Sequence, residues 1–110
     1  ADDAVAERER VVDALRETCD AMAAQLHRCA SDDYGTFTAR VDGTRWELKW
    51  EEGQTSYLRV GGEGGVYLLS QYQPPPAAEI REYAPQFREF VAAYNDHVAN
   101  LESDLATIEF

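Results

Sequence analysis

The dipeptide Asp42–Gly43 limits more than any other feature how this chain can fold. It separates two runs, residues 34–41 and 44–51, in which apolar and polar side chains alternate. Asp-Gly is favoured in two-residue type I′ hairpins, because both positions of that turn need positive φ angles. A slip of one residue would turn the apolar side chains of one strand to the other face. The pattern therefore predicts these pairs: Val41 with Thr44, Arg40 with Arg45, Ala39 with Trp46, Phe37 with Leu48 and Gly35 with Trp50.

Two further turns would extend this hairpin to a four-stranded antiparallel meander. A turn at Glu52–Gln54 and another centred on Glu63 both keep the apolar residues on one face. They predict the pairs Trp50 with Ser56, Leu48 with Leu58, Trp46 with Val60, Val60 with Val66 and Leu58 with Leu68. Val66–Gln73 then forms an uncharged edge strand, which Pro74–Pro76 end because proline cannot donate a ladder hydrogen bond. Natural sheet edges are usually protected, so we expect the C-terminal helix or a second subunit to cover this one.

The glycine-rich run Gly61–Gly65 could instead be a loop that binds phosphate. Phosphate loops use the spacings GxGxxG or GxxxxGK, and a helix N-terminus usually follows them. The run here matches neither spacing, carries Glu63 at its centre and precedes a predicted strand. We therefore expect a hairpin turn and no phosphate site.

Both ends of the chain are expected to be helical. Residues 2–30 contain no glycine or proline, and their apolar residues recur at spacings of three, four or seven. Residues 80–108 carry a broad apolar face, and Pro85 either kinks this helix or lies in the first turn of a second one. The fold class is therefore α+β: a single domain over residues 1–110, in the order α-β-β-β-β-α, with both helices on one face of the sheet. The predicted core is Val12, Leu15, Met22, Leu26, Phe37, Trp46, Leu48, Trp50, Leu58, Leu68, Phe87, Phe90 and Tyr94.

The charge balance limits the partners. The chain has 21 acidic and 10 basic residues, a net charge of −11, and Lys49 is its single lysine. This argues against direct binding of nucleic acid or an anionic membrane, which need positive charge. The acidic, lysine-poor composition resembles that of proteins from salt-loaded cytoplasms, although a GC-rich genome could also favour arginine over lysine. No apolar run reaches the length of about 20 residues that spans a bilayer, so we predict a cytoplasmic protein.

The residue types that carry catalysis or bind metals lack a known spacing. Cys19 and Cys29 would lie about 15 Å apart along one helix, too far for a disulfide, and there is no CxxC pair. Asp96 adjoins His97, but neighbouring helical side chains diverge. We therefore assign no catalytic residue, no metal site and no cofactor, and whether the chain is an enzyme stays uncertain.

The second face of the sheet holds the candidate binding residues. The predicted register brings together six of them there: Arg40, Arg45, Lys49, Tyr57, Arg59 and Tyr67. Leu69 is also expected on this face. Glu47 is placed to pair with Arg59, and Tyr67 to stack on Arg59. This face is either a solvated surface with cross-strand ion pairs or a docking surface for an anionic group.

Two functions fit these observations. The first is a non-catalytic interaction module that binds a protein partner through the second face or the 66–73 edge strand. A homodimer is expected, because a helix of about 40 Å overhangs strands of about 26 Å and leaves apolar surface to bury. An acidic decoy for a basic partner is a variant of this hypothesis. The alternative is a small anionic-ligand binding protein or enzyme that uses Arg40, Arg45, Lys49 and Arg59.

Overall fold

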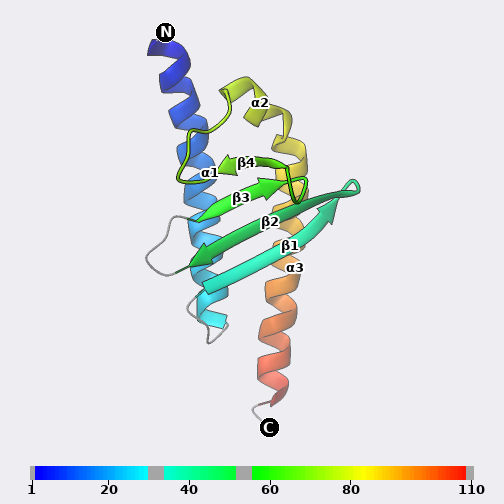
Figure 1. Cartoon of the computed structure of the whole chain (residues 1–110). Coiled ribbons are helices and arrows are strands. Elements are labelled where there is room, and N and C mark those ends of the chain that lie inside the picture. Colours follow the sequence, from blue (N-terminus) through cyan, green and yellow to red (C-terminus); the bar gives the residue numbers. More distant parts are fainter. Residues whose placement is uncertain (1, 30–33, 52–55, 109–110) are drawn as a thin grey trace.

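The chain forms an antiparallel sheet with helices before and after it. The computed structural model describes the backbone of residues 2–29, 34–51 and 56–108. Figure 1 shows the two long helices on one face of the sheet, while the other face is open. The predicted α+β order is confirmed: α1 (Asp2–Cys29), β1 (Tyr34–Val41), β2 (Thr44–Glu51), β3 (Tyr57–Val60), β4 (Val66–Leu69), α2 (Ala77–Glu82) and α3 (Ala84–Ile108), with strand order β1-β2-β3-β4.

The first hairpin has the predicted register along its whole length. Asp42 and Gly43 have φ angles of 50° and 77°, as the two central positions of a type I′ turn require. Arg40 therefore lies opposite Arg45, and Gly35 opposite Trp50. The β2–β3 pairs Trp46–Val60 and Leu48–Leu58 are also confirmed. The predicted turn at Glu52–Gln54 lies outside the described residues.

The last pair of strands departs from the predicted register. Val60 faces Val66 as expected, but Leu58 faces Leu69 and not Leu68, because β4 contains a bulge. The extra residue of a bulge lets two neighbouring side chains turn to the same side of a sheet. Leu68 and Leu69 are both 1% exposed and belong to the core. The prediction that Leu69 lies on the open face was therefore wrong.

The edge strand is also shorter than predicted. It ends at Leu69, whereas the sequence pattern extended it to Gln73. The carbonyl oxygen of the next residue, Ser70, accepts a hydrogen bond from Nη2 of Arg16 in α1 at 3.4 Å. The chain therefore leaves the sheet edge as soon as its two leucines are buried.

The glycine run is a hairpin turn, as predicted. Gly61, Gly62 and Gly64 have φ angles of 99°, 69° and 78°, a region that other residues rarely adopt. The amide of Gly61 donates to the carbonyl of Arg45 at 2.7 Å, and that of Gly65 donates to the carbonyl of Gly62 at 2.9 Å. These two amides are thus used within the protein.

The core lies between the sheet and the helices. Nine of the predicted core residues are buried, whereas Val12, Leu15, Trp50 and Phe87 are only half-buried. Pro85 lies in the first turn of α3, after Tyr83 has ended α2, so the second alternative for this proline is confirmed. The core also contains buried residues that were not among those predicted for it: Cys19, Ala23, Val41, Val60, Leu69, Ile80 and Val98.

The two long helices overhang the sheet at opposite ends. Figure 1 shows the start of α1 beyond the β4 edge and the end of α3 beyond the β1 edge. The molecule is accordingly elongated, with extents of 59 × 32 × 23 Å. Val5, in the overhanging part of α1, is 43% exposed. Within the described residues, no helix is long and apolar enough to cross a membrane.

Candidate functional site

The sheet brings the six predicted binding residues together on its open face. Alternate residues of β1, β2, β3 and β4 point to this side, because the side chains of a strand alternate between faces. Lys49 lies opposite Tyr57, and Arg59 lies between Glu47 on one side and Tyr67 on the other. We call this set the cationic face: Arg40, Arg45, Lys49, Tyr57, Arg59 and Tyr67.

Glu47 is the centre of the cationic face. The residue is only 9% exposed although it lies on the side that no helix covers. Its Oε1 accepts hydrogen bonds from the hydroxyl of Tyr57 and from Nη2 of Arg59, both at 2.9 Å. Nη2 of Arg45 lies 3.7 Å from Oε2. The Arg59 pair was predicted from the register, whereas the Tyr57 bond was not, because it runs diagonally between β2 and β3.

Arg59 is held on three sides. Its guanidinium lies over the ring of Tyr67, 5.9 Å from the centroid, and its Nη1 is 3.5 Å from the Tyr67 hydroxyl. The hydrogen bond with Tyr67 is the main reason why the pKa of Arg59 is raised. The rings of Tyr57 and Tyr67 meet edge to face at 5.6 Å. The buried Nε of Arg59 has no hydrogen-bond partner among the described residues.

The tyrosine beside Glu47 stays protonated. Burial, followed by the hydrogen bond to Glu47, raises the pKa of Tyr57 to about 12. The hydroxyl therefore acts as a donor to the carboxylate throughout the physiological range. The hydrogen bonds from Tyr57 and Arg59 to the same carboxylate oxygen fix this group of side chains in place.

The exposed part of the cationic face is the pair formed by Arg40 and Arg45. Both residues are exposed, and the side chain of Arg45 is 56% exposed, against 22% for Arg59. Tyr67, on β4 at the other edge of the same face, is 42% exposed. Like charges that lie directly opposite one another destabilise a sheet. The arrangement therefore presents positive charge to whatever approaches this face.

Comparison with known families identifies the chain. The family described as halobacterial profilin-superfamily domain matches residues 3–96, which include all four strands. The chain belongs to this family. Neither the curated proteins nor the solved structures yield a significant match to the chain. The halobacterial description of the domain agrees with its acidic, lysine-poor composition.

Three potentially reactive side chains on the helix side of this halobacterial profilin-superfamily domain, those of Ser56, His97 and Cys19, are part of its packing. The hydroxyl of Ser56 donates to Oδ1 of Asp20 at 2.5 Å, which joins the start of β3 to α1. The imidazole of His97 lies 5.2 Å from the ring of Phe37, centroid to centroid. Burial raises the pKa of the Cys19 thiol to about 12, so this thiol is a weak nucleophile. Among the described residues, no three side chains are grouped as metal ligands would be.

Proposed function

We propose that this halobacterial profilin-superfamily domain is a non-catalytic interaction module whose cationic face docks an acidic surface of a partner protein. One observation carries the proposal: Arg40 and Arg45 lie opposite each other, exposed, on the side of the sheet that no helix covers. The two like charges repel each other in the free protein, and of the two arginines only Arg45 has an ion pair among the described residues, with Glu47 at 3.7 Å. An anionic partner group between the two guanidinium groups would remove that repulsion.

The surroundings of this pair suit a protein partner. Arginine and tyrosine are enriched among the residues that dominate interface energies. Arg59 and Tyr67 are held in place through Glu47, so they lose little side-chain freedom on binding. The rest of the molecule carries a large excess of acid, so an acidic partner would be repelled elsewhere and oriented toward this face.

The alternative, a small anionic ligand held by Arg40, Arg45, Lys49 and Arg59, has less support. Small-molecule sites are concave and enclose most of their ligand. Arg40 and Arg45 are exposed on an open sheet, and the pocket described below is lined by other residues. The edge strand is also a weaker candidate, because β4 has only four residues and contains a bulge.

Charge reversal on the open face tests the proposal. The double variant Arg40→Glu/Arg45→Glu is expected to reduce capture of a stoichiometric protein partner from the native lysate by about tenfold or more, because acidic groups would then oppose the partner's acids. The matched control is Arg10→Glu/Arg88→Glu, which changes the net charge equally on the helix side. Partner capture that survives the first variant, or that both variants abolish equally, contradicts docking on this face.

We also propose that the domain is a homodimer. Val5, in the part of α1 that overhangs the sheet, is an exposed apolar side chain that a second subunit would cover. Light scattering after size exclusion is expected to give twice the chain mass of 12.4 kDa, more completely at high salt, where repulsion between the acidic subunits is screened. Val5→Glu should shift the protein toward the monomer. A monomer at both low and high salt, at high protein concentration, would rule the dimer out.

A further inference from the structure

A pocket lies on the helix side of the sheet, away from the cationic face. It has a volume of about 410 Å³ and is bounded by α1, α2, α3 and β4. Small-molecule sites commonly have volumes of about 300–1,000 Å³. The pocket forms because α1 and α3 pack against each other only sparsely. They lie apart on the sheet, and α2 closes one end of the space between them (Figure 1).

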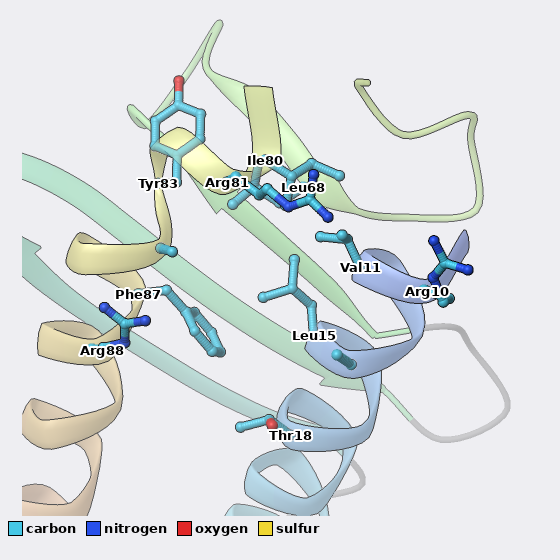
Figure 2. Close-up of a pocket in the computed structure, with 12 residues that line it drawn as sticks. Arg10, Val11, Leu15, Thr18, Leu68, Ile80, Arg81, Tyr83, Phe87 and Arg88 are labelled. Atoms are coloured by element: carbon cyan, nitrogen blue, oxygen red, sulfur yellow. The ribbon is translucent and has the colours of Figure 1, made fainter. Parts of the chain in front are cut away.

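The walls of the pocket are apolar. Figure 2 shows Leu15 of α1 and Phe87 of α3 facing one another across the space, with Leu68 and Ile80 at one end. Leu68 and Ile80 are fully buried, whereas Leu15 and Phe87 are only half-buried. The apolar surface of the last two is therefore in contact with solvent inside the pocket. Covering it would be favourable, at about 25 cal/mol per Å².

The remaining wall carries positive charge. Each of the three helices contributes one arginine to the lining: Arg10, Arg81 and Arg88. Among the described residues, no acidic side chain lines the pocket, although the chain has 21 acids against 10 bases. Arg81 is already paired with Glu7, at 2.5 Å. Arg10 and Arg88 are exposed on opposite sides of the pocket (Figure 2) and form no ion pair within the described part of the chain.

We infer that this pocket binds a single-chain anionic amphiphile, a long-chain alkyl carboxylate. The alkyl chain of this ligand lies between Leu15 and Phe87. Its carboxylate contacts an arginine at the side of the pocket where the alkyl chain emerges. The net charge of the whole protein would favour a cationic ligand. The preference of the pocket for an anion therefore comes from the arginines that line it. The inference does not depend on the cationic face, which lies on the other side of the sheet.

The probe is dodecanoate, below its micelle-forming concentration, added to the ¹⁵N-labelled chain in about 1 M KCl. At that salt the Debye length is about 3 Å, so the overall charge is screened and direct contacts remain. We expect saturable shifts of the Leu15, Thr18 and Phe87 amide signals. The fluorescence of Trp46 should change in parallel, because its ring lies 6.2 Å from that of Phe87.

Two variants test which arginines bind the carboxylate. Arg10→Gln/Arg88→Gln is expected to weaken dodecanoate binding by about threefold to fivefold, the effect of losing an ion pair with an exposed side chain. The matched control Arg40→Gln/Arg45→Gln removes the same charge from the open face and should leave the affinity unchanged. Both pairs are exposed, so the amide spectrum is expected to show an intact fold.

A comparison of head groups completes the test. Dodecyltrimethylammonium, with the same chain length and the opposite charge, is expected to bind the pocket at least about tenfold more weakly than dodecanoate. The inference is overturned if dodecanoate gives no saturable shifts at the pocket. Equal affinity in Arg10→Gln/Arg88→Gln, tighter binding of the cation, or binding of an acidic amphipathic peptide in preference to dodecanoate would also overturn it. Loss of partner capture in Arg40→Glu/Arg45→Glu has no bearing on these outcomes.

Discussion

Replacing Trp46 with alanine is expected to lower the free energy of unfolding by about 3–5 kcal/mol. The residue has no exposed surface, and its ring lies 5.5 Å from Phe90, 6.2 Å from Phe87 and 6.1 Å from Tyr83. Its indole N–H also donates to Oε1 of Gln86 at 3.1 Å. The substitution would leave a cavity where β2 meets α3 and would remove the partner of that amide oxygen.

Urea unfolding followed by circular dichroism would measure this loss without relying on tryptophan fluorescence. Domains are stable by about 5–15 kcal/mol, so the variant would be partly unfolded at moderate temperature. Trp50→Ala is the matched control, because Trp50 is on the same strand and face but only half-buried, and its loss should cost clearly less. Equal costs at the two positions would show that Trp46 is not the centre of the core.

Gly65→Ala is expected to cost about 2–3 kcal/mol, the range of an overpacked site. A Cβ at this position would lie too close to the backbone: 2.9 Å from the carbonyl oxygen of Gly62, and in severe overlap with the carbonyl of Val60. Backbone atoms cannot move aside as a flexible side chain can. The turn between β3 and β4 would have to open, and the Val60–Val66 pair with it.

Gly64→Ala separates this crowding from the effect of the backbone angle. Gly64 has a φ of 78°, but a Cβ there would meet nothing within 4 Å. Only the left-handed conformation would be penalised, by about 1 kcal/mol. Denaturant midpoints of the two variants should therefore rank Gly65→Ala as the less stable. The opposite ranking would mean that the φ angles, and not the close approach, make this turn need glycine.

Much of the sheet could be predicted because its signals are local. Asp42–Gly43 sets one turn, and side-chain alternation sets the faces of β1, β2 and β3. The bulge in β4 could not be found in this way. It has no signal in the residues themselves, because Leu68 and Leu69 fit either register equally well. The register of β4 is decided by the burial of both leucines against the helices.

The cationic face was predicted in its positions and in one of its pairings. The register placed Arg40, Arg45 and Arg59 on one surface and set Glu47 and Tyr67 on either side of Arg59, as the structure shows. Periodicity does not predict how deeply Glu47 is buried, or the diagonal hydrogen bond that it accepts from Tyr57. These features depend on the lengths and angles of side chains from three strands, which only the folded sheet brings together.

Local chemistry in the chain was therefore enough to determine the order of the elements, the first hairpin, the two faces and the acidic surface. These features depend on residues that are close together in the sequence, because turn preference and the alternation of side chains are local properties. The tertiary structure decided the bulge, the depth of Glu47 and the pocket between α1, α2 and α3. Arg10 and Arg88 are 78 residues apart in the chain, so their place around one apolar space follows only from how the helices pack.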